Sequence, residues 1–256
     1  MTNALINIDF QKDNFNKAYE KVIINNTFFE QDAYYLNYKS RYLNTIKALS
    51  KLNLPISSNI LEISGGQISL LLKEMYNLNC TVVDVNDKYE TGIIENGIDF
   101  CVCDLLHDDI PGENQYDLIV MCEVIEHLTV PPDWTFKKLK KHLKPGGWLL
   151  LTTPNFYRFR NLVRMVLGIE IFCPFFQPER GQGIGHFIEY SKENLEWSLE
   201  KAGFESITIE HKQLDFSGAT TLAKLARIIS SPLFIRPLWR DNLVATAQKP
   251  NNSVLS

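Results

Sequence analysis

Apolar and polar residues follow two alternating patterns along this chain from about residue 56 onward. Five short apolar runs are typical of buried strands, and they span residues 59–63, 80–85, 100–103, 117–122 and 148–153. Between them lie segments with helical spacing, one of which contains Ile68, Leu71, Leu72 and Met75. Strands that alternate with helices predict a mainly parallel sheet that helices cover on both faces.

Helical spacing also connects five residues before the first strand, namely Tyr35, Tyr38, Tyr42, Ile46 and Leu49. This spacing predicts a helix over residues 33–52, which Pro55 and the polar residues after it end. The first thirty residues are polar and rich in asparagine, with scattered aromatics. We therefore expect them to form a loosely packed arm.

The second half of the chain predicts further elements around the sheet. A helix over residues 133–143 ends at Pro145-Gly146-Gly147, and another begins after Ser191 and ends at Gly203. Further strands are predicted at 204–211 and 243–248. Residues 155–185 hold aromatics, arginines, prolines and glycines, which indicates an insertion over the sheet.

Residues 219–240 combine apolar side chains with one lysine and three arginines and contain no acidic residue. Such a segment is either a cover over a substrate or a helix that lies on a membrane surface. Pro232 and Pro237 interrupt it, which favours the cover.

Composition narrows the class of protein. The chain has 256 residues and a net charge of −4, so no overall positive field attracts nucleic acid. The five cysteines form no CxxC pair and sit mostly among apolar residues, which favours free thiols in a reducing, cytoplasmic setting. The N-terminus lacks the pattern of a signal peptide, and no apolar run approaches the ~18 residues of a membrane-spanning helix. Five lysines between residues 137 and 144 are typical of a solvated helix face.

Candidate chemistry lies where the predicted strands end. Glu62 precedes a turn of Ser64, Gly65 and Gly66 that runs into a helix, and glycines there let a ligand approach the backbone N–H groups. Asp84 ends the next strand, where a carboxylate can accept hydrogen bonds from two ribose hydroxyls. Asp104 follows the third strand, at a place suited to an adenine amino group.

The fourth strand is followed by Glu123, Glu126 and His127. Their i, i+3, i+4 spacing predicts three side chains on one face of an α-helix. Because α/β sheets bind ligands at the carboxyl ends of their strands, we expect all four features to form one site.

These residues belong to motifs that resemble a known family. In order and spacing, residues 61–67, 83–85, 103–105, 116–128 and 144–155 are similar to the motifs of class I S-adenosylmethionine-dependent methyltransferases. Residues 185–187 and 201–204 fit the same group. The similarity covers about residues 56 to 210. Within that family, the motifs are similar to those of the branch that contains the ubiquinone-biosynthesis O-methyltransferases and many natural-product and glycan methyltransferases.

The resemblance implies a fold and a cofactor. The fold is α/β and Rossmann-like, with a seven-stranded, mainly parallel sheet whose last strand is antiparallel, and S-adenosylmethionine is the cofactor. We expect one domain over residues 1–256. Its parts are a helical N-terminal arm at 1–55, a cofactor-binding half at 56–154, an insertion or lid at 155–185, and a C-terminal half at 186–256 with a substrate cover at 219–240.

The resemblance also implies ten cofactor-binding residues. They are Glu62, Ser64, Gly65 and Gly66 at the methionine end, Asp84 and Val85 at the ribose, Asp104 and Leu105 at the adenine, and Cys122 and Glu123 bordering the cofactor. The family's turn usually reads Gly-x-Gly-x-Gly, and here those positions are Ser64, Gly66 and Ile68. We expect Ile68 to pack against the sheet and cofactor binding to survive.

The main catalytic task of such a protein is to align the acceptor with the methyl group, because a sulfonium already carries an activated methyl group. If the acceptor is a hydroxyl, a base must take its proton, and His127 is the candidate. Glu126 and His186 are the other catalytic candidates. We favour metal-independent transfer to a small-molecule hydroxyl, in secondary-metabolite, quinone or glycan biosynthesis, with no DNA partner.

Two alternatives stay open. Small-RNA 3′-end 2′-O-methyltransferases use a Glu-x-x-Glu-His motif and a later histidine to hold a divalent metal, which would make Glu123, Glu126, His127 and His186 ligands. The acidic balance and the lack of an RNA-binding module argue against RNA. The second alternative is a non-catalytic partner that binds the cofactor and supports another enzyme.

Overall fold

The structure is a computed structural model that describes residues 5–6, 10–26, 29, 32–52, 54–55, 57–171, 185–214 and 231–251. Cys173 lies outside the described residues, as do residues 172–184 of the expected insertion and residues 219–230 of the expected cover.

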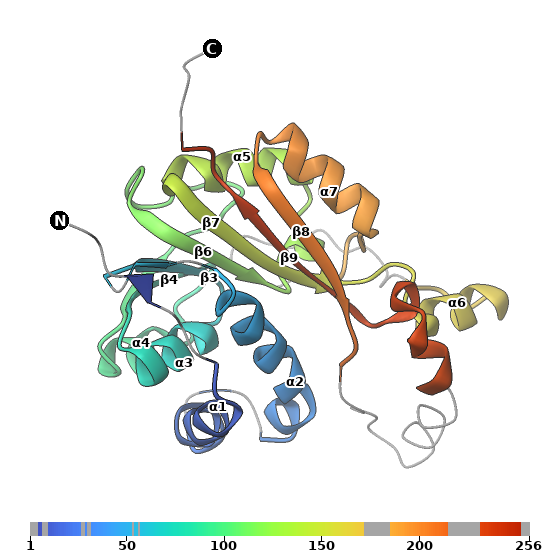
Figure 1. Cartoon of the computed structure of the whole chain (residues 1–256), viewed down its shortest axis with the longest axis horizontal. Helices are drawn as coiled ribbons and strands as arrows, with labels where there is room; N and C mark the ends of the chain where they lie inside the picture. The colour runs from blue at the N-terminus through green and yellow to red at the C-terminus, as the bar shows by residue number, and fades with distance from the viewer. Residues whose placement is uncertain are drawn as a thin grey trace.

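Seven strands form the central sheet (Figure 1). They are β3 (Asn59–Ile63), β4 (Asn79–Asp84), β5 (Asp99–Val102), β6 (Tyr116–Cys122), β7 (Leu143–Pro154), β8 (Glu205–Lys212) and β9 (Asn242–Gln248). Their order is β5-β4-β3-β6-β7-β9-β8. The strands from β5 to β7 are parallel, and β9 is antiparallel to both β7 and β8. The predicted Rossmann-like sheet with an antiparallel last strand is therefore confirmed.

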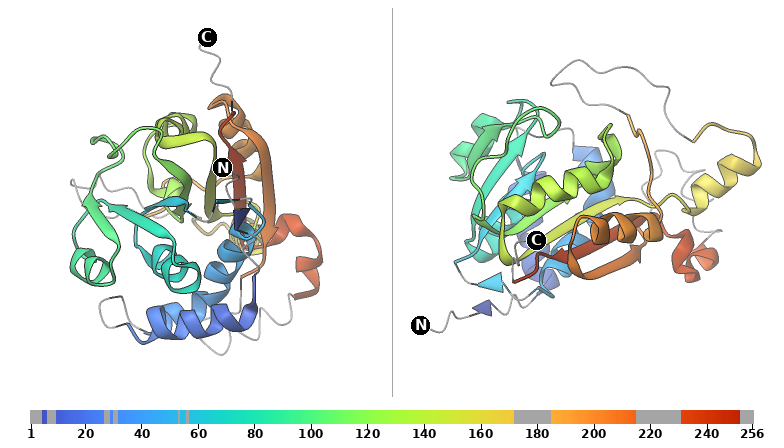
Figure 2. Two further views of the ribbon diagram at one scale, coloured as in Figure 1. Left: turned by 60° about the vertical axis from the view of Figure 1, so that its left-hand side comes forward. Right: turned by 90° about the horizontal axis from the view of Figure 1, so that it is seen from above.

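Helices cover both faces, as predicted. They are α1 (Lys12–Tyr19), α2 (Asp32–Leu49), α3 (Gln67–Tyr76), α4 (Glu90–Glu95), α5 (Pro132–His142), α6 (Phe159–Val166) and α7 (Lys192–Lys201). In Figure 1, α1 to α4 lie below the sheet and α5 and α7 above it, and Figure 2 shows the same layers from two other sides. A small separate sheet pairs β1 (Leu5–Ile6) with β2 (Leu54–Pro55).

Each face of the sheet has its own apolar core, because successive side chains of a strand point to opposite faces. Ile60 of β3 belongs to the core under α1, α2 and α3, whereas Leu61 and Ile63 belong to the core under α5 and α7. The same alternation places Glu62 on the α3 side. This side is where the N-terminus of α3 begins, at Gln67.

The prediction of a loosely packed N-terminal arm is wrong for the described residues. Four side chains from α1 and the π-helical turn η1 (Glu20–Ile24) are at most 8% exposed: Phe15, Tyr19, Val22 and Ile23. The Phe15 and Tyr19 rings, one helical turn apart, pack 5.4 Å from each other. Frequent asparagines concealed this short amphipathic stretch, whose apolar residues join the core under α3.

The helix expected to end before Pro145-Gly146-Gly147 does end there, and these three residues belong to the strand that follows. α5 ends at His142, and β7 begins directly at Leu143, so these three residues lie inside the strand. A Cβ on Gly147 would lie 2.9 Å from the Lys144 carbonyl oxygen. The glycine therefore allows a close backbone approach at the start of β7, which is a role that residue spacing does not reveal.

The described parts of the expected insertion and cover contact each other. The Phe159 ring of α6 packs 6.2 Å from Phe234 and 6.4 Å from Trp239. These partners belong to two short 3-10 turns, η3 (Ser231–Ile235) and η4 (Pro237–Trp239). Asn155 Nδ2 also donates to the carbonyl of Arg240, at 2.8 Å. In the described part of the chain, no helix has the length and apolar character needed to cross a bilayer.

Candidate active site

The site begins where the chain changes direction in the sheet. From β3 the chain builds outward through β4 and β5, and it then returns to place β6 on the other side of β3. Loops after neighbouring strands therefore diverge at this point and leave a crevice at the carboxyl ends, which is the usual ligand site of such sheets. Residues after β3, β4 and β6 all meet there.

The turn after β3 has an unusual backbone. Ser64, Gly65 and Gly66 have φ angles of 72°, 85° and 90°, in the left-handed region. A Cβ on Gly66 would lie 2.4 Å from Ile93 Cδ1, so glycine is required there. Ile68, at the position of a glycine in the family's pattern, is buried in the core under α3, as expected.

Glu62 holds this turn against α3. Its two carboxyl oxygens accept hydrogen bonds from the backbone N–H groups of Ile68, at 3.1 Å, and Ser69, at 2.6 Å. Burial raises the pKa of Glu62 to about 7, even though these hydrogen bonds act in the opposite direction. Glu62 is thus a buried acid at a helix N-terminus, and it also lines the cavity described below.

The two aspartates expected at the ribose and the adenine brace loops. Asp84 accepts hydrogen bonds from Gly65 N, at 2.8 Å, and Ser64 Oγ, at 3.1 Å. Asp104 accepts one from the backbone N–H of Leu106, at 2.9 Å, and lies 2.8 Å from His107 Nδ1. Asp84 is the last residue of β4, next to Val85, and Asp104 lies two residues past the end of β5, next to Leu105.

A cavity of about 200 Å³ opens between α2 and the strand ends. Five of the expected cofactor residues line it: Glu62, Ser64, Gly65, Cys122 and Glu123. Gly66, Asp84, Val85, Asp104 and Leu105 lie outside its lining. Burial raises the pKa of the Cys122 thiol to about 12, so this side chain is an uncharged wall rather than a nucleophile.

Helix α2 forms the other side of this cavity, and sequence analysis did not single out its Arg41. Tyr34, Tyr35, Tyr42 and Arg41 line it from that helix. Arg41 Nη2 lies 3.1 Å from Glu123 Oε2, and Arg41 Nε is buried with no hydrogen-bond partner among the described residues. The aromatic spacing predicted the helix, but no local pattern distinguished Arg41 from the other basic residues.

The prediction that Glu123, Glu126 and His127 share one α-helical face is wrong. Glu123 has a φ of 56°, and only a three-residue 3-10 turn, η2 (Ile125–His127), follows it. Thr152 donates to Glu123 at 2.8 Å, whereas Thr153 donates to Glu126 at 3.0 Å. Because Thr152 and Thr153 are successive strand residues that point to opposite faces, the two glutamates are held apart.

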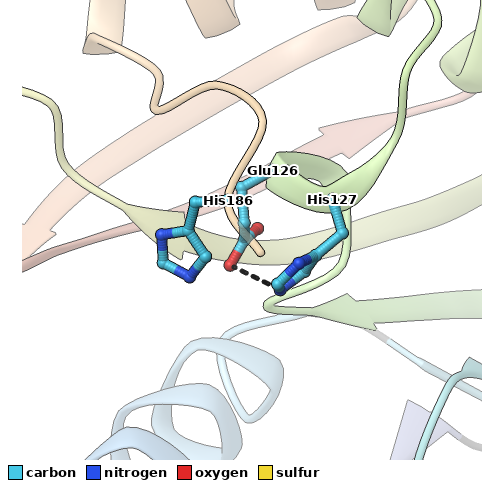
Figure 3. A group of neighbouring side chains, drawn as sticks. All are labelled: Glu126, His127 and His186. Atoms are coloured by element: carbon cyan, nitrogen blue, oxygen red, sulfur yellow. Dashed lines mark ion pairs between the residues drawn. The ribbon is translucent and has the colours of Figure 1, made fainter. Parts of the chain in front are cut away.

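Glu126, His127 and His186 form a cluster beyond this point (Figure 3). One ligand atom from each side chain lies within 4.8 Å of the others, and Glu126 Oε1 is 4.0 Å from His127 Nε2. Glu126 is fully buried, and its Oε1 has no hydrogen-bond partner among the described residues. Burial, with the charge of Glu123, raises the pKa of Glu126 well above its usual range.

His186 reaches the cluster from the segment before α7, as expected. The N–H of Phe187 donates to the Glu126 carbonyl at 2.7 Å, which fixes this segment over η2. The two imidazole rings are 5.0 Å apart and nearly perpendicular. Two imidazoles beside a carboxyl group suit proton transfer, and their nitrogen and oxygen atoms could also bind a divalent cation. Glu123 is not part of this group.

Known proteins agree with this architecture. A family model described as a methyltransferase domain matches residues 34–209. A segment of 48 residues is 42% identical to the mitochondrial ubiquinone biosynthesis O-methyltransferase of Candida albicans, and it covers 19% of this chain and 14% of that protein.

Two solved structures show the fold. Phosphoethanolamine N-methyltransferase 2 of Haemonchus contortus, in complex with S-adenosyl-L-methionine, is 17% identical with a TM-score of 0.58, over 91% of this chain and 56% of that chain. A possible histamine N-methyltransferase of Thermotoga maritima is 15% identical with a TM-score of 0.55, over 84% and 93%. The family match covers strands β3 to β7, the turn and the carboxylates described above. The chain therefore belongs to the class I methyltransferase family, whose methyl donor is S-adenosylmethionine.

Proposed function

We propose that the chain transfers the methyl group of S-adenosylmethionine to a hydroxyl of a small-molecule acceptor, with His127 as the base. The observation that carries this proposal is the pair of imidazoles, His127 and His186, over the buried carboxyl of Glu126. Neutral imidazole accepts a proton near neutral pH, which is what a hydroxyl nucleophile requires and an amine with a free lone pair does not.

The methionine end of the cofactor fits the cavity beside the glycine turn. Its carboxylate would meet the buried guanidinium of Arg41, whose Nε has no partner among the described residues. The cavity, at about 200 Å³, is smaller than the ~300–1,000 Å³ of typical ligand sites. The nucleoside would therefore extend along the strand ends past Asp84 and Asp104, where we place the ribose and the adenine.

The reaction then proceeds in one displacement. The acceptor oxygen attacks the methyl carbon, the carbon–sulfur bond breaks, and neutral S-adenosylhomocysteine leaves. The proton of the hydroxyl passes to Nε2 of His127. Glu126 Oε1 lies 4.0 Å from this nitrogen, so its carboxyl group faces the imidazolium as that charge develops.

The oxygen specificity, the compartment and the class of acceptor all belong to this proposal. The 48-residue similarity to an O-methyltransferase includes no complete domain, so oxygen specificity is part of this proposal rather than of the family assignment. Four free cysteines in the described part of the chain favour a reducing compartment such as the cytoplasm. We keep the quinone, glycan and secondary-metabolite classes as acceptor candidates.

The test is turnover of S-adenosylmethionine with panels of phenols, aliphatic alcohols, amines and short RNAs, with and without EDTA. We expect S-adenosylhomocysteine to form with hydroxyl acceptors, and activity to survive exhaustive chelation. Methylation of amines alone would refute the oxygen assignment. Loss of activity in EDTA that Mg²⁺ or Mn²⁺ restores would instead make Glu126, His127 and His186 metal ligands and favour the RNA 3′-end alternative.

A further inference from the structure

A second carboxylate lies behind His186, on the side away from His127. Glu189 is buried, and its Oε1 lies 3.2 Å from His186 Nδ1. Arg158 Nη2 donates to the same oxygen, and Asn161 Nδ2 donates to Oε2 at 2.6 Å. Arg158 is the residue before α6, and Asn161 lies in the first turn of that helix. The expected insertion therefore contributes directly to the histidine cluster.

These contacts determine the chemical state of Glu189. Burial alone would raise the pKa of this carboxyl, but the hydrogen bonds from His186 and Asn161 and the charge of Arg158 outweigh burial and lower it. An ionised carboxylate only accepts hydrogen bonds. His186 Nδ1 must therefore carry its proton, and in the neutral ring Nε2 is then the bare, accepting nitrogen.

The other side of the His186 ring is available to a ligand. Nε2 makes no hydrogen bond to any described residue, and the side chain is 34% exposed. The Glu126 carboxyl lies between this ring and that of His127 in Figure 3. A nitrogen of His186 therefore lies within 4.8 Å of ligand atoms of Glu126 and His127, while its Nδ1 is bound to Glu189.

We propose that Glu189 is a positioning residue that fixes the proton of His186 on Nδ1 and so presents Nε2 as a hydrogen-bond acceptor, beside His127, for a second hydroxyl of the acceptor molecule, next to the one whose proton His127 takes. Arg158 and Asn161 hold Glu189 in place for this purpose. The inference rests on the proposed function, because it assumes that a hydroxyl is bound at the histidine pair. If the proton lay on Nε2 instead, the His186 nitrogen that faces the substrate would donate a hydrogen bond rather than accept one.

The experiment compares three variants of the full chain. Glu189→Leu combined with Arg158→Met removes the anchor and its charged partner together, so no unpaired buried charge is left to unfold the protein. Glu189→Gln keeps an oxygen that can still accept from Nδ1. Glu200→Gln on α7 is the matched control, since it removes an exposed carboxylate from a neighbouring element.

Nitrogen NMR of histidine-labelled protein with S-adenosylhomocysteine bound, at about pH 8, reports the tautomer, and His186→Gln assigns the signal. We expect Nδ1 protonated in the wild type, in Glu200→Gln and largely in Glu189→Gln, and a mixture of tautomers in the double variant. kcat should fall at least ~10-fold in the double variant, less in Glu189→Gln, with KM for S-adenosylmethionine unchanged.

A proton on Nε2 of wild-type His186, or an unchanged kcat in the double variant, would overturn the proposal. The NMR measurement needs no acceptor molecule. If no hydroxyl compound is methylated, the proposed function fails, while the tautomer still decides whether Glu189 orients His186.

Discussion

Arg41 and Glu123 form an ion pair of 3.1 Å that joins the N-terminal helix α2 to the end of β6. Glu123 is also bound by Thr152 Oγ1 at 2.8 Å and Asn242 Nδ2 at 2.9 Å, so strands β7 and β9 fix it from the other side. The pair closes one wall of the cavity at the strand ends. Helix α2 is therefore part of the site, although it precedes the strand-end motifs from which sequence analysis predicted the site.

Arg41→Met should weaken binding of S-adenosylhomocysteine by ~10-fold or more, because a hydrogen bond from a charged group contributes ~1.5–3 kcal/mol. Glu123 keeps its two other hydrogen bonds in this variant, so the fold should survive. Titration calorimetry measures the affinity, and Lys47→Met, an exposed change on the same helix, is the control. Equal affinity in a folded Arg41→Met protein would remove Arg41 from the cofactor site.

Asp84→Ala should lower cofactor affinity by at least ~10-fold, through lost hydrogen bonds to the ribose. Because Asp84 also accepts from Gly65 N at 2.8 Å, part of the loss can come from a loosened turn. Urea unfolding separates the two effects, and Asp87→Ala on the same loop, where the side chain is exposed, is the control. A stable variant with wild-type affinity would show that Asp84 only braces the turn.

His127→Ala should lower kcat by ~10²–10⁴ and leave cofactor affinity nearly unchanged, because the imidazole acts on the acceptor's proton and not on the donor. Steady-state kinetics with a hydroxyl acceptor, together with calorimetry, provide both numbers. His211→Ala on β8 should behave as the wild type. A kcat within a few-fold of wild type would transfer the base role to another group, with His186 as the first candidate.

Glu62 predicts a specific pH dependence of stability. Its pKa is about 7 in the folded chain and 4.5 in its ordinary state. Between these pH values the unfolded chain has released the proton that the folded chain still holds. The free energy of unfolding therefore falls as pH rises, by up to ~3 kcal/mol. Above this window the contribution of Glu62 no longer changes with pH. Below pH 4.5 both states are protonated and no loss occurs.

Urea unfolding of the cofactor-free protein across this range tests the effect of Glu62. Glu62→Gln cannot ionise, so its stability relative to the wild type should rise between about pH 4.5 and 7. Glu126 titrates in the same direction but is present in both proteins and cancels in the comparison. Glu95→Gln, on the exposed side of α4, should follow the wild type. Parallel pH profiles for Glu62→Gln and the wild type would contradict the raised pKa.

The sheet was predictable because its signals are local and repeated. Each of the first five strands has a short apolar run, and the runs alternate with segments of helical spacing. This pattern predicted the order of the elements. It also predicted that Glu62, Asp84 and Asp104 lie at strand ends. Ile68 illustrates the same point. Its helical spacing with Leu71 and Leu72 predicted a buried side chain, which the structure confirms.

Other features depend on contacts between distant residues, and spacing could not show them. Arg41 faces Glu123 only because α2 packs across the end of β6. The i, i+3, i+4 pattern after β6 predicted a shared helical face, but the positive φ of Glu123 turns it away from Glu126. Glu189 behind His186 was likewise missed, because a carboxylate three residues from a histidine is common in any surface loop.

The central claim is that this site binds S-adenosylmethionine and uses it. Titration calorimetry of the wild-type chain with S-adenosylmethionine and with S-adenosylhomocysteine tests it most directly. The account predicts one saturable site per chain for both compounds, with competition between them. Absence of binding by either compound to the folded chain would contradict the account as a whole.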